Sequence, residues 1–378
     1  MLEELSQLVD IHYGKAPAFT SESETGVPVY GTGGIYGWAS RSLFNGPAIV
    51  VPRKGSLGNP QYVEGPFWAS DTTYALIPKR GVNARWIFYH LCAFDLTRLN
   101  EATGVPSISR DWLARSKFDR ADPDIQERTA NILHNTDRTI SKTEALIAKY
   151  QQIKAGLMHD LFTSGLDTDG KIRSVLPSSW KNESVSNLIS YISYGFTNPM
   201  PEALDGPLMV TAADIQDGEV CDWTCRHTER WAFDRLLTNK SRPIIGDLLI
   251  TKDGTLGRVA LVKCRDICIN QSVAVLRPVD STKGRWLYWL LQTPQYQDKM
   301  ISEAGGSTIK HIYISVINKM AVPFPDDDHE AIEIVGRMES IDSILRTEVS
   351  NRDKLRSIKQ GLSRALLTEA KSDGLPTT

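Results

Sequence analysis

The chain of 378 residues repeats itself, and the repeated segments occur in the same order in both halves. The matching pairs are DIHYG (10–14) with YISYG (191–195), RKGSLGN (53–59) with KDGTLGR (252–258), ARWIFYHL (84–91) with GRWLYWLL (284–291), EATGVPSIS (101–109) with EAGGSTIKH (303–311), and IKAGLMHDLFT (153–163) with IKQGLSRALLT (358–368). Chance similarity would not preserve this order, so the chain carries a duplicated module. The offset between the copies grows from 181 to 205 residues, which predicts insertions early in the second copy.

The first part of each half alternates short apolar runs with turn signals. AIVVP (48–52) and DLLIT (247–251) are typical of buried strands, and glycine-containing turns follow both. Apolar and aromatic residues recur at helical spacing over 83–99 and 283–302, which predicts a short helix in each copy. Each first part therefore reads as a mixed α/β globule.

The second part of each half has the composition of a long amphipathic helix. From Asp124 to about Thr163 there is no proline and a single glycine, Gly156. Apolar residues there, and again from Ile334 to Leu366, recur at spacings of three, four and seven. Proline and acidic residues stand at both expected starts, within ADPDIQE (121–127) and PDDDHEAIE (325–333). Two matching helices of this kind can pack along each other as a coiled coil.

These patterns predict a mixed α/β (α+β) fold in which two globular domains alternate with two long helices. The helices are expected to pack as an antiparallel coiled coil, which relates the two halves by a pseudo-two-fold axis. The expected boundaries are globular domains at 1–122 and 166–325, helices at 123–165 and 326–372, and a tail at 373–378.

Composition excludes several classes of protein. No run of about 18 apolar residues is present, so we expect no membrane span, and the acidic start MLEELSQLVD predicts a cytoplasmic protein. The formal net charge is −2, so nucleic acid could bind only at a local basic patch. Five cysteines argue against a disulfide framework. We interpret the C-x3-C pairs Cys221/Cys225 and Cys264/Cys268 as core or turn cysteines, since zinc sites favour C-x2-C; a metal role stays open.

Catalytic motifs are nearly absent. The sequence has no G-x-x-x-x-G-K-[ST] nucleotide loop and no H-E-x-x-H. GTGGIYG (31–37) does not lie between a clear strand and a long helix, which argues against dinucleotide binding. NPQY (59–62) approaches the N-P-P-[YFW] motif of adenine-N6 methyltransferases, but Gln61 replaces the second proline and the other half lacks the motif. We interpret NPQY as a turn.

The remaining candidate functional residues are cationic and hydroxyl side chains in loops, which suit ligand recognition. The repeated loops at 53–59 and 252–258 join cations, a glycine turn and small hydroxyl residues, and two further hydroxyl-rich loops end in a cation. Such side chains bind phosphates and base edges. A bland alternative is that the glycines only form hairpins and the cations are solvated. The candidate DNA-binding residues are Arg53, Lys54, Ser56, Asn59, Ser107, Arg110, Lys252, Thr255, Arg258, Ser307 and Lys310.

The sequence resembles the specificity subunits of type I restriction–modification systems. The stretch YGTGGIYGW…GPAIVVPRKGSLGNPQYVEGPFWASDTTYAL (30–76) carries most of the likeness, and LPSSW (176–180) resembles the usual start of a second recognition domain. The second copy departs from the pattern, because ICINQSVAV (267–275) stands in place of the FW..DT segment and the Gly-Gly segment is absent. The resemblance covers nearly the whole chain.

The resemblance implies a non-catalytic reader of double-stranded DNA. Each globule would be a target-recognition domain for one half of a split site, and the helices would set the spacing and dock two methyltransferase subunits. Motor–nuclease subunits would complete the complex; S-adenosylmethionine, ATP and Mg²⁺ would belong to these partners, with no cofactor on this chain. A related type II system, a stand-alone adenine-N6 methyltransferase and a scaffold that never touches DNA stay as alternatives.

Overall fold

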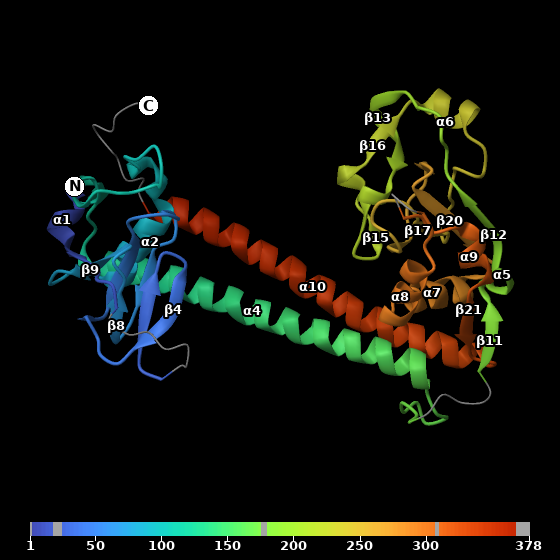
Figure 1. Ribbon diagram of the computed structural model, residues 1–378, viewed down its shortest axis with the longest axis horizontal. Helices are drawn as coiled ribbons and strands as arrows, with labels where there is room; N and C mark the ends of the chain where they lie inside the picture. Colours follow the sequence, from blue (N-terminus) through green and yellow to red (C-terminus); the bar gives the residue numbers. More distant parts are fainter. Residues whose placement is uncertain (1, 18–24, 175–179, 307–309, 368–378) are drawn as a thin grey trace. The chain divides into compact units, whose positions relative to one another are not determined.

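The computed structural model describes residues 2–17, 25–174, 180–306 and 310–367 (Figure 1). The chain divides into two compact units. Unit 1 comprises Met1–Leu146 with Glu348–Thr378, and unit 2 comprises Ile147–Thr347. Each unit therefore contains one globule together with part of both long helices.

Unit 1 is built on a four-stranded antiparallel sheet. Its strands, in spatial order, are β2 (Val9–Tyr13), β9 (Thr73–Pro78), β6 (Ala48–Pro52) and β7 (Gln61–Val63). All five residues of β6 are buried because both faces of the sheet are covered. Ile49 and Val51 pack toward helix α2 (Ala84–Ala93), whereas Ala48 and Val50 pack toward a second sheet. This explains why AIVVP is an uninterrupted apolar run.

The second sheet of unit 1 contains the glycine-rich segment. Its strands are β4 (Gly34–Ala39), β3 (Val27–Gly31), β8 (Pro66–Ala69) and β5 (Phe44–Asn45). GTGGIYG forms the turn of the β3–β4 hairpin, where Gly31 pairs with Gly34. The segment therefore connects two strands and does not lead into a helix.

Unit 2 repeats the main sheet strand for strand, and its second sheet has three strands in place of four. Its main sheet is β12 (Ile189–Tyr194), β20 (Val273–Pro278), β17 (Leu248–Thr251) and β18 (Val259–Leu261). The second sheet is β16 (Arg226–Thr228), β13 (Glu202–Val210) and β19 (Ile267–Ile269), in which β13 pairs parallel with β19 as β3 does with β8. The elements added between β13 and β17 are η2 (Ala212–Asp214), β14 (Ile215–Gln216), β15 (Glu219–Val220), η3 (Asp222–Thr224) and α6 (Arg230–Leu236).

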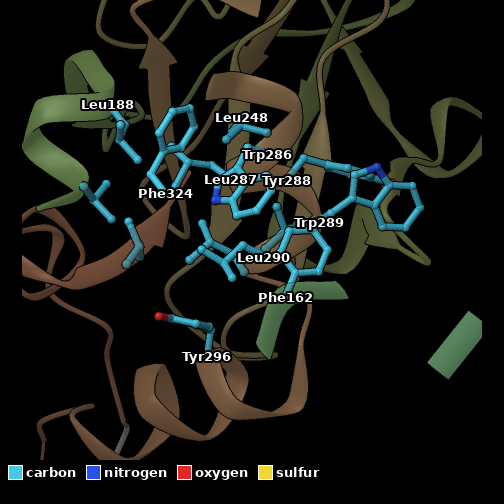
Figure 2. Close-up of a cluster of buried hydrophobic side chains, with 14 of the residues drawn as sticks. Phe162, Leu188, Leu248, Trp286, Leu287, Tyr288, Trp289, Leu290, Tyr296 and Phe324 are labelled. Carbon is cyan, nitrogen blue, oxygen red and sulfur yellow. The ribbon is translucent and has the colours of Figure 1, made fainter. Parts of the chain in front are cut away.

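One helix covers the main sheet in each unit. Trp86 of α2 and Trp286 of α7 (Ser281–Leu290) are both fully buried. Figure 2 shows Trp286 within a cluster that includes Phe162 and Phe324, whose ring centroids lie 4.7 Å and 5.7 Å from it. Because each tryptophan anchors its helix to the sheet, the repeated R-W pair marks equivalent positions in the two cores.

The helices expected over 83–99 and 283–302 are each broken in two. Helix α2 ends at Ala93, and a 3₁₀ turn, η1 (Leu96–Leu99), follows it. Asp95 caps the start of this turn by accepting a hydrogen bond from the Thr97 amide. Helix α7 ends at Leu290 and α8 (Pro294–Ser302) begins at a proline, which cannot donate the hydrogen bond that would continue the first helix. The expectation of one continuous helix was wrong at both places.

Each globule is closed by a short sheet beside its long helix. In unit 1, β1 (Leu2–Glu4) pairs with β10 (Lys117–Asp119), and in unit 2, β11 (Lys181–Ser184) pairs with β21 (Ala321–Phe324). The small helices in these regions are α1 (Leu5–Leu8), α3 (Arg110–Arg115), α5 (Val185–Leu188) and α9 (Ile314–Lys319). The strand before each long helix is thereby tied to the start of its own globule.

The two long helices are α4 (Pro123–Ser164) and α10 (Asp328–Leu366), and they run antiparallel in both units (Figure 1). In unit 1, Lys359 lies 2.5 Å from Asp137, and Arg356 lies 2.6 Å from Glu144 further along α4. In unit 2, Lys154 lies 2.5 Å from Asp342. As the α4 number rises the α10 number falls, which defines the antiparallel direction. Residues 368–372 of the expected second helix lie outside the described residues.

The cysteines are free thiols. Cys221, Cys225 and Cys268 are buried, and Cys225 donates a hydrogen bond of 3.4 Å to the Cys221 carbonyl. Burial raises the pKa of Cys225 to about 12, so it stays a thiol at neutral pH. Within the described ranges, no three His, Cys, Asp or Glu side chains gather as they would to hold a metal ion. Searched over the same ranges, the helices include none with the length and apolarity needed to traverse a bilayer.

Candidate nucleic-acid interface

In unit 1, the loop after β6 is joined to the hydroxyl-rich loop before α3. The Ile108 amide donates to the Arg53 carbonyl at 2.9 Å, and the Gly55 amide donates to the Pro106 carbonyl at 2.8 Å. These bonds place Lys54 opposite Ser107 in an antiparallel bridge. Gly55 has φ +82°, which only glycine adopts without strain. Three predicted DNA-binding residues, Arg53, Lys54 and Ser107, therefore come together.

Unit 2 joins its two loops through an equivalent backbone bond and bridge. The Ile312 amide donates to the Lys252 carbonyl at 2.9 Å, and Asp253 stands opposite His311 in an antiparallel bridge. Gly254 has φ +77° and takes the place of the turn glycine in the first unit. The duplication thus preserved the contact between the loops as well as their sequences.

The contacts correct one sequence alignment. The ungapped match of EATGVPSIS with EAGGSTIKH sets Ser107 against Ile309, but the bridges set Ser107 against His311. The difference is two residues, because Ile108 and Ile312 make the equivalent bonds to Arg53 and Lys252. Sequence similarity in a short glycine-rich loop could not fix this register.

An exposed tyrosine lies beneath the first cation of each loop. The Arg53 guanidinium lies 5.0 Å from the centre of the Tyr13 ring, and the Lys252 ammonium lies 5.7 Å from the Tyr194 ring. Tyr13 is 49% exposed and Tyr194 is 47% exposed. The ring holds the cation by a cation–π interaction while leaving part of the ring open to a ligand. These tyrosines are the next-to-last residues of the repeated segments DIHYG and YISYG.

The glycine after each tyrosine is required by a close approach of two backbones. A Cβ at Gly14 would lie 1.9 Å from the Ser70 carbonyl oxygen, and a Cβ at Gly195 would lie 1.8 Å from the Ile269 carbonyl oxygen. Any other residue would collide with that carbonyl oxygen and displace the backbone at the end of β2 or β12. Each glycine therefore keeps the preceding tyrosine at the edge of its loop pair.

The two loop pairs differ in charge. In unit 1, Arg53 donates to the Asp71 carbonyl at 3.2 Å, and Lys54 is exposed. Among the described residues, the Lys54 ammonium makes no hydrogen bond or ion pair. In unit 2, an aspartate, Asp253, occupies the position of Lys54. The first loop pair is therefore dicationic, whereas the second contains an internal ion pair.

Asp253 is the centre of a three-residue cluster. The Lys252 ammonium lies 2.9 Å and 3.0 Å from its two carboxylate oxygens, and His311 Nδ1 lies 2.6 Å from Oδ1. Burial raises the pKa of Asp253, but hydrogen bonds from His311 and Lys252 outweigh it, so the pKa lies below its ordinary value. The carboxylate is thus ionised at neutral pH. Lys252 is half-buried and paired, so the alternative of a freely solvated cation does not apply to it.

The other predicted residues occupy more peripheral places. Ser56, Asn59 and Lys310 are exposed in the loops, and Arg110 donates from Nε to the Ile11 carbonyl at 3.1 Å. Thr255 donates to the Ala212 carbonyl at 3.2 Å. Arg258 donates to the Ile215 carbonyl at 3.0 Å, so both are tied to the inserted segment of unit 2. Ser307 lies outside the described residues.

Sequence reasoning missed four residues of these sites. Tyr13 and Tyr194 were visible in the match DIHYG/YISYG, but the pattern alone did not show that they lie beneath the loop cations. Asp253 stands within the quoted loop KDGTLGR and His311 ends GGSTIKH. Their pairing joins two loops 58 residues apart, for which no sequence signal exists.

A family model described as "Type I restriction modification DNA specificity domain" matches residues 2–153 and 233–359. The two matched segments contain both loop pairs. The chain belongs to this family. The likeness stated from the sequence is therefore confirmed, and the second match begins after most of the segment inserted in unit 2.

Known members of the family resemble the chain in sequence and fold. The specificity subunit of the type I restriction enzyme EcoBI from Escherichia coli is 22% identical over 247 residues, which is 60% of this chain and 51% of the relative. The matched part of this chain thus spans about half the length of that relative. The S subunit of a type I system from M. genitalium superposes with a TM-score of 0.68 at 15% identity, covering 97% of this chain and 96% of the other.

A second solved structure, from work on assembly and conformational transition of the type I R-M system, has a TM-score of 0.56 at 14% identity. It covers 98% of both chains. At such low identity these two structures show a shared fold over nearly the whole chain. The predicted fold of two mixed α/β globules alternating with two long helices is thereby confirmed.

Proposed function

We propose that this chain is the DNA-reading subunit of a type I restriction–modification complex. Each globule, 1–122 and 166–325, acts as a target-recognition domain for one half of a bipartite site. The observation that carries the proposal is the duplicated loop pair, because duplex DNA offers two half-sites to a duplicated reader. The two globules differ in sequence and in loop charge, so the half-sites are expected to differ.

Local charge supports DNA as the ligand despite the net charge of −2. Arg53 and Lys54 lie side by side on one loop, with Ser107 opposite Lys54. Lysine and arginine pair with phosphates and guanine edges, and serine hydroxyls reach phosphates. The tyrosine ring beneath the cation restricts the motion of the cationic side chain. Less side-chain entropy is therefore lost when the cation binds DNA.

The long helices, in the spacer segments 123–165 and 326–372, are proposed to measure the gap and to dock two methyltransferase subunits. The apolar face of α4 is wider than its contact with α10 covers. Leu133, Ile140 and Ile147 are buried, whereas Ile132 and Ile153 are 36% and 38% exposed. Apolar side chains left exposed on a helix are suited to a protein partner. Motor–nuclease subunits would join the same complex.

The chain itself is proposed to be non-catalytic. A structural place for NPQY supports this: Gln61 begins β7 and donates from Nε2 to the Gly31 carbonyl at 2.9 Å. In the N-P-P-[YFW] motif the asparagine and a prolyl carbonyl hold the target amine, and here Gln61 replaces the second proline. S-adenosylmethionine, ATP and Mg²⁺ are therefore assigned to partners.

The test is a map of methylated adenines in cells that carry this chain with its partner subunits, compared with cells lacking only this chain. We expect methylation at a bipartite sequence with a fixed unread gap, and its disappearance without the chain. Tight stoichiometric binding of S-adenosylmethionine to the purified chain alone would instead support an enzyme.

A further inference from the structure

We propose that Arg226 and Glu202 together recognise a G·C base pair in the half-site of the second globule. The two side chains form an ion pair in the wall of a polar hollow of unit 2. The inference deepens the proposed function and rests on it, since it assumes that this face of unit 2 meets DNA. It assigns two specificity-determining residues that the sequence did not suggest.

The hollow has a volume of about 270 Å³ and collects polar side chains from several segments. Those that line it are Thr197, Asn198, Glu202, Arg226, Asn270 and Gln271. Thr197, Asn198 and Gln271 are exposed, and within the described ranges their side chains make no hydrogen bond. Polar groups that converge on a concave surface without partners are typical of a binding site.

One turn connects the hollow to the loop at 252–258. The Gln271 amide donates to the Phe196 carbonyl at 2.8 Å, and the Lys252 amide donates to the Ser272 carbonyl at 2.9 Å. Phe196 also lines the hollow and follows two residues after Tyr194, whose ring lies beneath Lys252. A duplex that contacts Lys252 would therefore extend over the hollow.

Paired strands hold the backbones of Arg226 and Glu202 in place. Arg226 begins β16 and Glu202 begins β13, and these strands lie side by side in unit 2 (Figure 1). Thr228 pairs with Glu202, is fully buried, and donates from its hydroxyl to the Pro201 carbonyl at 2.8 Å. The side chains of Arg226 and Glu202 are 65% and 59% exposed, so the ion pair is presented to solvent from a rigid platform.

An arginine beside a glutamate matches the major-groove edge of a G·C pair. Guanine presents the acceptors N7 and O6, and cytosine presents the N4 amino group as a donor. Arginine has five N–H donors, so its hydrogen bond to Glu202 leaves others for guanine, while the carboxylate can accept from cytosine. An A·T pair in the same orientation would set the adenine amino group against the guanidinium and the thymine O4 against the carboxylate. A phosphate would also be repelled by Glu202, so the pair favours a base edge over the DNA backbone.

The pair belongs to the part of the chain that distinguishes the second globule from the first. Both residues fall within 154–232, between the two segments that the family model matches. Strand β13 has nine residues, whereas β3, which pairs in the equivalent way, has five. A residue that makes one half-site unlike the other is expected in such a segment.

The experiment measures binding of the full chain, with any partner that co-purifies, by fluorescence anisotropy. The duplexes carry the mapped methylation site, the same site with each G·C pair replaced in turn by A·T, and a random sequence. At one position, wild type should prefer G·C by about tenfold to about a hundredfold, and Arg226→Ala should bind both duplexes equally. Discrimination at the other positions and affinity for the random duplex should stay at wild-type level. Glu202→Gln, which keeps the shape of the side chain, should lose part of the discrimination at the same position.

The matched control is Arg230→Ala. Arg230 is 52% exposed and pairs with Asp266 at 2.7 Å, and neither residue lines the hollow. This variant should retain discrimination at every position. Circular dichroism melting of each variant checks the fold, and Glu202→Gln carries the test if Arg226→Ala unfolds.

The outcomes separate the inference from the proposed function. Equal weakening on every duplex, including the random one, would indicate a phosphate contact and overturn the inference alone. Wild-type discrimination at every position in Arg226→Ala, or a mapped site without a G·C pair in either half, would also overturn it alone. Failure of a folded wild-type complex to bind any duplex would overturn both.

Discussion

Lys154 on α4 and Asp342 on α10 lie 2.5 Å apart, and the same ion pair recurs in the other unit with the two helices exchanged. There Lys359 of α10 lies 2.5 Å from Asp137 of α4. Lys154 and Lys359 are matching residues of the repeat, at its offset of 205. Each pair sits against an aromatic residue of its globule: Lys154 lies 5.0 Å from the Trp289 ring, and the Tyr89 hydroxyl donates to Asp137 at 2.9 Å.

This pair should contribute measurably to the stability of its unit. The side chains of Lys154 and Asp342 are 22% and 14% exposed. Loss of the carboxylate would therefore leave the Lys154 ammonium without its partner in a site largely shielded from water. Asp342→Asn should lower the free energy of unfolding by about 1–3 kcal/mol. Asp353→Asn, in an exposed ion pair on the same helix, should cost less than about 1 kcal/mol. Hydrogen exchange of α4 and α10 amides measures both, and equal losses would contradict the assignment.

Acid should destabilise unit 1 through His90. Burial lowers the pKa of His90 to about 4, although the Asp119 carboxylate raises it slightly. An unfolded histidine titrates near 6.5, so between these values the unfolded chain binds a proton that the folded chain does not. Stability from this group is fully present above about pH 6.5 and falls by about 1.4 kcal/mol per pH unit below it.

The variant His90→Phe keeps an aromatic ring beside Trp86 and Phe118 but cannot titrate. Urea unfolding at pH 7 and pH 5, followed by hydrogen exchange of α2, should show a smaller pH effect in the variant than in wild type. His159→Gln, an exposed histidine of α4, serves as the control and should retain the wild-type pH effect. An undiminished pH effect in His90→Phe would refute the role of this residue.

Lys54→Ala should weaken DNA binding without changing the melting temperature, because Lys54 is exposed and makes no ion pair within the described ranges. If the ammonium meets a phosphate, binding falls for every sequence and the dependence on salt becomes shallower by about one unit. If it meets a base edge, discrimination at one position falls by about 1–3 kcal/mol. Fluorescence anisotropy across a salt series decides between them, with Lys171→Ala as an exposed control. If Lys54→Ala binds DNA as tightly as wild type, the loop has only a structural role.

Lys252→Ala should behave differently although the two lysines lie in matching loops. Lys252 is half-buried against Asp253, so its loss leaves a carboxylate that has lost one of its two hydrogen-bond donors. We expect lower stability of unit 2 in addition to weaker binding, by about 1–3 kcal/mol. The double variant Lys252→Ala/Asp253→Ala should recover part of that stability. A double variant no more stable than the single one would argue against the pair.

The spacer prediction needs a change in both helices. Four residues added after Leu146 in α4 alone would shift it against α10 and break the ion pairs on one side. We therefore expect a matched pair of insertions, after Leu146 and after Asn351, to keep both Lys–Asp pairs. Four residues add about 6 Å of helix, or one to two base pairs. The methylation map should show a longer gap with unchanged half-sites, and an unchanged gap would show that the helices do not measure it.

Partner docking is tested at two matching residues. Ile153 and Ile358 are 38% and 53% exposed and belong to the repeated segments at the ends of the two helices. The double variant Ile153→Glu/Ile358→Glu should lose co-purification with the methyltransferase subunit while retaining its helix content. Glutamate in place of the exposed lysine Lys149 provides the control. Undiminished co-purification would place the docking surface elsewhere.

The sequence by itself determined the duplication, the main strands and the presence of the two long helices. These follow from order and periodicity, which are local: AIVVP is buried on both faces, and α4 spans Pro123–Ser164 where an uninterrupted stripe was expected from Asp124. The loops 53–59 and 252–258 were correctly matched for the same reason. The breaks between the short helices were missed, although Pro294, which begins α8, was visible in the sequence.

Only the tertiary structure decided which of those residues meet. Tyr13 lies beneath Arg53, and His311 binds Asp253, because strands and loops far apart in sequence are brought together by the sheets. It also showed that Lys252, a candidate DNA-binding residue in the sequence, is the partner of a carboxylate. Contacts between separate segments depend on backbone registers that carry no periodic signal, and a shift of two residues, as between Ile309 and His311, changes the chemistry of the site.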